Sequence, residues 1–257
     1  MNINIRELEF SYTNEKTLNG VSGDLEKGEF ISIIGPNGTG KSTLIKCING
    51  ILKAQKGLLS INDVNIEAMT QNDIARVISY VPQSTSSLFN LSVFDMVLLG
   101  RRPHATWRSS KVDRLKALKA MKTLDIESLA MKSFNELSGG QKQKVVIARA
   151  IAQETKIIVL DEPISNLDIK HQIEVMEILK SLVDNTGVTA ISVVHDLNIA
   201  IKYSNKIMVM HKGKAVAIGD PKIVLTKEMI ASVYGVEVTC SNVEDNLVII
   251  PQKIICS

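Results

Sequence analysis

The chain has 257 residues, and 45% of them are hydrophobic, which is enough to build one large α/β domain or two small ones. Its 30 Lys and Arg residues nearly balance its 27 Asp and Glu residues, and the net charge of +3 excludes a strong overall field for nucleic acid or anionic lipid. No stretch approaches the roughly 18 to 20 consecutive apolar residues of a membrane helix, and the start does not resemble a signal peptide. We therefore expect a protein of the cytoplasm that reaches a membrane only through a partner.

The first part of the chain alternates short strands with one helix. Residues 3–12 and 20–34 are typical of strands around a turn at 26–29, which predicts a small antiparallel sheet. Apolar residues at helical spacing predict a helix from Ser42 to Leu52, after which residues 57–61 return to strand.

The rest of the chain divides into a helical part and an alternating part. After a strand at 77–81, residues 84–152 are mostly helical in pattern and predict an inserted helical subdomain. One face of it is marked by Val112, Leu115, Leu118 and Met121. Strands at 156–160, 188–194 and 207–210, with a helix at 173–183, then indicate a parallel sheet covered by helices. We predict a single α/β domain over 1–257, with a short C-terminal extension at about 220–257.

A glycine-rich segment between the apolar run 30–34 and the first helix fits the spacing G-x-x-x-x-G-K-[ST]. It consists of Gly35, Pro36, Asn37, Gly38, Thr39, Gly40, Lys41 and Ser42. The glycines let backbone N–H groups turn inward, and the helix beginning near Lys41 adds the positive end of its dipole. Lys41 would reach the outer phosphates of a polyphosphate, and Ser42 would bind a magnesium ion. The alternative is a turn that merely joins strand to helix, but its setting favours a phosphate loop.

Two adjacent carboxylates, Asp161 and Glu162, end the apolar strand 157–160. Neighbouring residues on an extended chain point to opposite sides, so the two can have different roles. Asp161 would hold magnesium, and Glu162 would orient and polarise the attacking water. The alternative is an acidic pair exposed in a loop with no function. The presence of a phosphate loop in the same chain favours the functional interpretation.

A second helix is predicted to begin at the segment Ser138, Gly139, Gly140 and Gln141, which contains two glycines. A helix N-terminus of this kind can bind an anion, although the same residues would also serve as a simple helix cap. Ligands of parallel sheets bind beyond the carboxyl ends of the strands, where the phosphate loop, Asp161 and His195 all fall.

These segments resemble, in order and over nearly the whole chain, the motifs of the ATP-binding cassette proteins. Gln83 matches the family's Q-loop glutamine, Asp168 lies in a segment similar to its D-loop, and His195 matches its H-loop histidine. The resemblance implies a P-loop NTPase fold with a RecA-like core, catalytic roles for Lys41, Glu162 and His195, and a metal site at Ser42, Gln83 and Asp161. It extends nucleotide contacts to Thr43 and to Tyr12, whose ring would stack on adenine or else be merely half-buried.

In this family two chains share each ATP site, so the resemblance implies a homodimer that binds ATP and Mg²⁺. The serine and glycines at 138–140 of one chain would bind the γ-phosphate held in the phosphate loop of the other. The donors of both chains are needed to stabilise the attacking and leaving oxygens.

Residues 93–104 are similar to a stretch common in cassettes of the iron-siderophore, haem and cobalamin importers, as is the end of the chain. The resemblance implies peripheral attachment to the cytoplasmic face of a membrane, polytopic permease subunits and, indirectly, an extracytoplasmic substrate-binding protein. Basic residues in this region would dock a permease or form an ordinary solvated loop. They are Arg101, Arg102, His104, Arg108 and Lys111.

Three residues depart from the usual family pattern, namely Lys144, Ile164 and Asn166. Lys144 stands where arginine is common, which keeps the charge but loses a bidentate contact. Two other classes of protein are alternatives to a transporter ATPase. A cassette associated with nucleic acid would have a long coiled coil or a second cassette, and a P-loop kinase or GTPase would leave residues 137–141 unexplained. Neither fits, and no partner of nucleic-acid type is expected. An importer for another solute, such as a metal ion, is the closer alternative.

Overall fold

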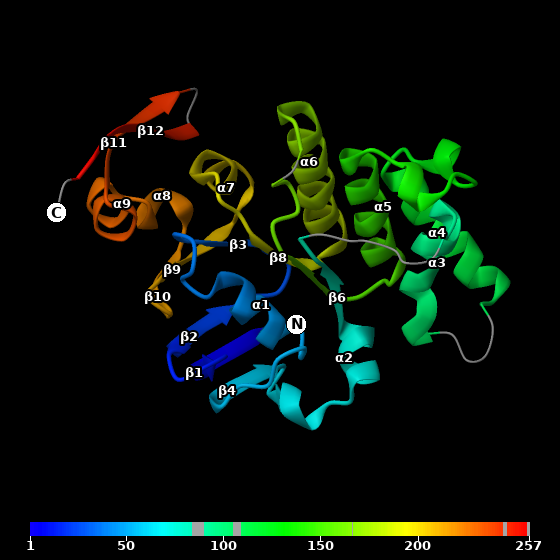
Figure 1. Ribbon diagram of the computed structural model, residues 1–257, viewed down its shortest axis with the longest axis horizontal. Helices are drawn as coiled ribbons and strands as arrows, with labels where there is room; N and C mark the ends of the chain where they lie inside the picture. Colours follow the sequence, from blue (N-terminus) through cyan, green and yellow to red (C-terminus); the bar gives the residue numbers. More distant parts are fainter. Residues whose placement is uncertain (84–89, 105–108, 166, 244–245, 256–257) are drawn as a thin grey trace.

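A six-stranded sheet of order β10-β9-β3-β8-β7-β6 runs through the centre of the computed structural model (Figure 1). The structure describes residues 1–83, 90–104, 109–165, 167–243 and 246–255. The strands are β3 (Phe30–Ile34), β6 (Ile78–Val81), β7 (Ile157–Leu160), β8 (Thr189–Val193), β9 (Lys206–His211) and β10 (Lys214–Gly219). All are parallel except β10, which pairs antiparallel with β9. Every residue of β3, β7 and β8 is buried, as expected for strands covered on both faces.

The predicted antiparallel sheet near the N-terminus is confirmed, with the order β2-β1-β4-β5. Its strands are β1 (Ile3–Ser11), β2 (Lys16–Leu25), β4 (Lys56–Ile61) and β5 (Val64–Asn65). The run 30–34 does not belong to it but is β3 of the central sheet. The helix α1 (Lys41–Ile48) is shorter than predicted, because Gly50, with φ of 66°, turns the chain and leaves Ile51 exposed.

The described part of residues 84–152 is mostly helical, as predicted, and lies at the right of Figure 1. Its helices are α3 (Val93–Leu98), α4 (Lys111–Thr123) and α5 (Gly139–Ala152), with 3₁₀ turns at Leu99–His104, Glu127–Leu129 and Phe134–Glu136. The helix α2 (Gln71–Val77) precedes this part. The helices α3, α4 and α5 share a core around Phe134 and Val145, both fully buried.

The face predicted for α4 is wrong in part. Met121 is buried, but Val112, Leu115 and Leu118 are exposed. The buried side instead carries Asp113, Ala117, Ala120 and Met121. Small residues allow α4 to pack closely on its neighbours, and this tertiary constraint overrides the apolar spacing.

Besides the strands of the central sheet, the described residues after β7 form further helices and a hairpin. They are α6 (Ile169–Thr186), α7 (Leu197–Tyr203), α8 (Pro221–Val224), α9 (Lys227–Tyr234), β11 (Val236–Val243) and β12 (Asn246–Ile254). The helix α6 begins earlier than predicted because the Asp168 side chain accepts a hydrogen bond from His171 N–H and caps it. The hairpin β11–β12 contacts α9 and α7 (Figure 1). Within the described ranges, no helix combines the length and apolarity that crossing a membrane requires.

Candidate functional site

The loop from Gly35 to Ser42 joins β3 to α1 at the carboxyl edge of the central sheet. A Cβ added to Gly35 would lie 2.1 Å from the Met210 carbonyl oxygen, and one added to Gly40 would lie 2.7 Å from that of Thr17. Only glycine fits at these two positions, and φ of 94° at Gly40 turns the chain into α1. The N-terminus of α1 therefore opens into the loop, which is the geometry predicted for phosphate binding.

Lys41 is buried inside this loop, where its Nζ donates hydrogen bonds of 2.7 Å to the carbonyl oxygens of Gly35 and Pro36. Burial lowers the pKa of the ammonium, while the nearby carboxylates of Glu162 and Asp161 oppose that shift. The loop carbonyl oxygens thus bind the Lys41 ammonium, and the phosphate oxygens of a nucleotide can replace them as its hydrogen-bond acceptors.

Asp161 lies directly beyond β7 and faces the phosphate loop. Its Oδ1 accepts a hydrogen bond of 2.8 Å from Ser42 Oγ, and its Oδ2 accepts a longer one, of 3.5 Å, from the Tyr80 hydroxyl. Burial raises the pKa of Asp161. The predicted pair of Ser42 and Asp161 is therefore assembled. Tyr80 is a member of this group that the sequence did not single out, and its only signal is its place at the end of the strand 77–81.

The Glu162 carboxylate contacts two other side chains, those of Gln83 and His195. Its Oε2 accepts a hydrogen bond of 2.7 Å from Gln83 Nε2, and its Oε1 lies 2.7 Å from His195 Nε2. The three residues follow β6, β7 and β8, neighbouring parallel strands. Asp161 and Glu162 do face different partners, but strand alternation is not the reason. The strand ends at Leu160, and Glu162 has φ of 51°, a left-handed conformation that a non-glycine residue adopts at a cost.

The residues Ser138–Gln141 form the first turn of α5. Ser138 Oγ accepts a hydrogen bond from Gln141 N–H, and Gln141 Oε1 accepts one from Ser138 N–H. These residues therefore cap the helix, as the alternative interpretation predicts. A Cβ added to Gly140 would lie 3.6 Å from the ring of His171, which itself contacts Asp168 at 2.8 Å. The 138–141 turn and Asp168–His171 thus form a second cluster, in which His171 is an addition to the prediction. Its signal is the Asp-x-x-His spacing at a helix start.

Within the described residues, no hydrogen bond or ion pair connects this second cluster to the phosphate loop. Tyr12 is also apart, because it is 58% exposed and its ring packs edge-on against Phe10 at 4.9 Å. Asn37 and Gly38 are exposed, whereas Thr43 is buried in α1. One chain therefore presents two separate groups of the predicted residues.

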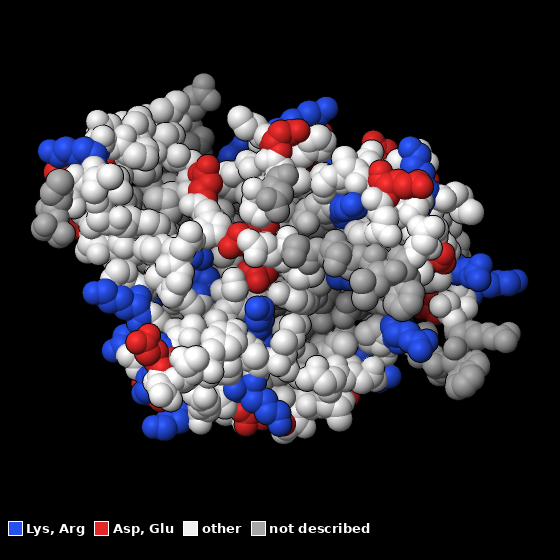
Figure 2. Space-filling model, in the orientation of Figure 1, with Lys and Arg blue, Asp and Glu red and all other residues white. Residues whose placement is uncertain are grey.

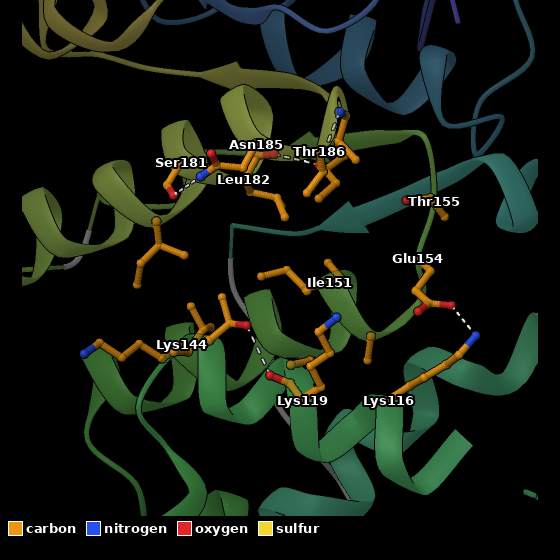
Figure 3. A pocket seen from close by; sticks show the side chains of 18 of the residues that line it. Lys116, Lys119, Lys144, Ile151, Glu154, Thr155, Ser181, Leu182, Asn185 and Thr186 are labelled. Atoms are coloured by element: carbon orange, nitrogen blue, oxygen red, sulfur yellow. Dashed lines mark hydrogen bonds and ion pairs between the residues drawn. The ribbon is translucent and has the colours of Figure 1, made fainter. Parts of the chain in front are cut away.

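Figure 2 shows carboxylates near the centre of the face viewed, with Lys and Arg side chains mostly around its rim. A pocket of about 990 Å³ lies elsewhere, between α4, α5 and α6 (Figure 3). It is lined by residues such as Thr155 and Val188, which adjoin the amino ends of β7 and β8, whereas the phosphate loop is at the opposite edge.

Of the described basic residues predicted to dock a partner, Arg102, His104 and Lys111 are exposed, and only Arg101 is not. Arg101 is buried, and its guanidinium binds Asp113 Oδ1 at 3.0 Å and the Ala152 carbonyl oxygen at 2.8 Å. His104 Nε2 lies 2.8 Å from the Gln153 carbonyl oxygen. Arg102 and Lys111 are exposed, and Arg108 lies outside the described residues. Arg101 is thus a structural residue.

Two of the three departures from the family pattern are described. Lys144 Nζ lies 2.8 Å from Glu174 Oε2 and so connects α5 to α6. Ile164 is buried in the core, and Asn166 lies outside the described residues.

Comparison with known proteins gives consistent matches. The family profile described as ABC transporter matches residues 18–165. An uncharacterized ABC transporter ATP-binding protein of Methanocaldococcus jannaschii is 41% identical over 98% of both chains. The petrobactin import ATP-binding protein FpuC of Bacillus anthracis is 34% identical, over 92% of this chain and 88% of its own. The ferric enterobactin transport ATP-binding protein FepC of Escherichia coli is 36% identical, over 93% and 88%.

Solved structures match over similar lengths. The chain has a TM-score of 0.85 and 30% identity to a protein described as a metal-chelate type ABC transporter in an inward-facing conformation, over 98% of this chain and 97% of that one. It has a TM-score of 0.76 and 28% identity to a dimeric ATP-binding cassette in a post-hydrolysis state with ADP and Pi, over 85% and 98%.

Proposed function

The chain belongs to the ABC transporter family, and we propose that it is the subunit that hydrolyses ATP to drive import of an iron chelate, haem or cobalamin. One observation carries the proposal: the ends of β6, β7 and β8 bring Gln83 and His195 to within 2.7 Å of Glu162, beside the Ser42–Asp161 pair. This is the arrangement that a hydrolytic reaction of a bound polyphosphate requires.

In the proposed reaction, Glu162 accepts a proton from the water that attacks the γ-phosphorus. The bond from this phosphorus to the bridging oxygen breaks, and the products are ADP and inorganic phosphate. Gln83 and His195 hold the carboxylate in place, and His195 can also donate a hydrogen bond to a γ-phosphate oxygen as charge develops. Lys41 and the N–H groups of the phosphate loop bind the outer phosphates.

Ser42, Asp161 and Gln83 fit a magnesium site. They offer a hydroxyl, a carboxylate and an amide carbonyl, and oxygen ligands of this kind, together with phosphate oxygens, are what Mg²⁺ prefers. The 2.8 Å contact of Ser42 with Asp161 places two of these ligands side by side. Bound there, Mg²⁺ would neutralise charge on the β- and γ-phosphates.

A second copy of the chain would complete the site. The 138–141 turn and Asp168 make no hydrogen bond or ion pair with the phosphate loop of their own chain among the described residues, and Ser138 and Gly139 are exposed. We infer that they meet the γ-phosphate bound by the partner copy, with ATP between the two. The dimeric relative with ADP and Pi supports this inference.

The partners follow from the relatives that import petrobactin and transport ferric enterobactin. We infer that the dimer attaches peripherally to the cytoplasmic side of polytopic permease subunits, which receive the chelate from an extracytoplasmic binding protein. Co-purification with a polytopic membrane protein is expected, whereas association with ribosomes or DNA would contradict this assignment.

Uptake by cells tests the substrate class. Cells carrying Lys41→Ala should lose uptake of the iron chelate, haem or cobalamin that the transporter carries, because the ammonium that binds the outer phosphates is gone. The control variant is Lys53→Ala, which changes an exposed lysine outside α1. Uptake of all three compounds at the normal rate in Lys41→Ala cells would refute the proposal.

Tyr12→Ala tests adenine stacking. We expect the Kd for ATP to rise about five- to tenfold, the lower part of the range for loss of one stacked base, because the ring is already exposed. Tyr12→Trp should keep the affinity, and fluorescence titration with nucleotide measures both. Equal Kd values for Tyr12→Ala and the unchanged chain would remove Tyr12 from the site.

A further inference from the structure

The C-terminal extension, of which the structure describes residues 220–243 and 246–255, packs against the strand ends that lead to the phosphate loop and to His195. Ile230, Val233 and Ile249 of the extension share a buried cluster with Ile34 and Val194. Ile34 directly precedes Gly35 of the phosphate loop, and Val194 directly precedes His195. Two of the strand ends that lead to catalytic groups, those of β3 and β8, therefore rest on side chains from the end of the chain.

A pair of hydrogen bonds adds a directional contact. Asn198 Nδ2 donates to the Ile249 carbonyl oxygen at 3.2 Å, and Ile249 N–H donates to Asn198 Oδ1 at 2.8 Å. The amide thus binds β12 as a neighbouring strand would. Asn198 is in the first turn of α7, which Asp196 caps through hydrogen bonds of 2.8 and 3.1 Å. Because His195 immediately precedes that cap, fixing α7 fixes the direction in which the imidazole leaves the backbone.

Tyr234 makes a corresponding apolar contact near the phosphate loop. It is the last residue of α9, and it packs on the same buried cluster as Ile34, the residue directly before Gly35. Burial raises the pKa of the Tyr234 hydroxyl to about 12, so it stays protonated at neutral pH. The strand end that leads into the phosphate loop is thus supported by this ring.

We propose that the C-terminal extension positions the catalytic site, with Asn198 holding His195 through α7 and the Tyr234 ring supporting the end of β3 that leads into the phosphate loop. Both are positioning residues, since neither touches Glu162 or the loop lysine in the contacts of the described residues. This inference rests on the proposed function of His195 and of the phosphate loop, and it adds a role for a segment outside the region that the family profile matches.

The two positions make different predictions. Asn198→Ala frees the start of α7, so kcat for ATP hydrolysis should fall about fivefold while KM for ATP stays unchanged, because His195 acts on the transition state. Tyr234→Ala removes the ring that supports the start of the phosphate loop, so KM should rise about fivefold with kcat unchanged. For Asn198, a factor of this size corresponds to the loss of one hydrogen bond of ordinary strength.

The experiment is steady-state ATP hydrolysis by the full-length chain, with the active fraction of each variant counted by nucleotide titration. The matched control is Lys253→Ala, which removes an exposed pair with Glu237, at 3.3 Å, from the same hairpin. It should change neither constant. With kcat expressed per active chain, a merely structural role would leave both constants of both test variants unchanged, and that result would overturn the proposal.

Two further outcomes distinguish the positioning role from the proposed function. If the unchanged chain hydrolyses ATP and Lys41→Ala abolishes the reaction, but Asn198→Ala and Tyr234→Ala retain both constants, the positioning role is wrong and the proposed function stands. If the unchanged chain does not hydrolyse ATP, the proposed function fails and the positioning role fails with it.

Discussion

Glu162→Gln is expected to lower kcat for ATP hydrolysis by about two to four orders of magnitude, the usual contribution of a general base. The amide cannot take a proton from water, yet it has nearly the same shape and can still bond to Gln83 and His195, which lie at 2.7 Å in the unchanged chain. ATP binding should therefore persist. Because hydrolysis is what weakens the closed state, the variant should accumulate as an ATP-bound dimer, measured by light scattering.

The matched control is Glu177→Gln, which changes an exposed glutamate of α6 in the same way. It should hydrolyse ATP at the normal rate and form no stable dimer. A Glu162→Gln chain that remains monomeric in saturating ATP, or that turns over as fast as the unchanged chain, would contradict both the base and the shared site.

The parts of the site that the sequence predicts are those with short-range causes. The phosphate loop needs glycine at Gly35 and Gly40 because backbone atoms of other strands lie within 3 Å of any added Cβ. That constraint is visible as a fixed spacing. Asp161 and His195 follow apolar runs that can only be buried parallel strands, so their common edge is also predictable.

Side-chain partners across the fold are less predictable. The basic stretch at 101–104 looks like a solvated loop, but Arg101 is buried because Asp113, 12 residues later, turns towards it. The apolar residues of α4 mark a face that the fold leaves exposed. In both cases the burial of a side chain depends on its neighbours in the fold. Neighbours that are distant in sequence leave no local pattern in the sequence from which this burial could be predicted. The pairing of Asn198 with Ile249, 51 residues apart, is of the same kind.

The left-handed backbone of Glu162 is a third kind of feature. Nothing in the residue type predicts φ of 51°, since side chains other than glycine disfavour it. The conformation aims the carboxylate at Gln83 and His195, away from Asp161 and its partner Ser42. Backbone strain at such a position is common where function demands a particular direction.

Arg101→Ala is expected to lower the free energy of unfolding by about 3 to 5 kcal/mol, the usual cost of removing one partner from a buried ion pair. Asp113 would keep its charge in a buried site without the guanidinium at 3.0 Å, and the Ala152 carbonyl oxygen would lose its donor. Urea unfolding measures the effect, and Arg102→Ala, an exposed neighbour, should change stability by less than about 0.5 kcal/mol.

The pKa of Asp113 is lowered to about 2, first by hydrogen bonds from Ser110 and then by Arg101. Because a depressed carboxyl pKa stabilises the fold above its unfolded value, this stabilisation should be complete above pH 3.8 and disappear as the pH falls through 2. The difference between the two arginine variants should therefore shrink over that interval, and a difference that is absent at neutral pH would mean that Arg101 is not part of the buried framework.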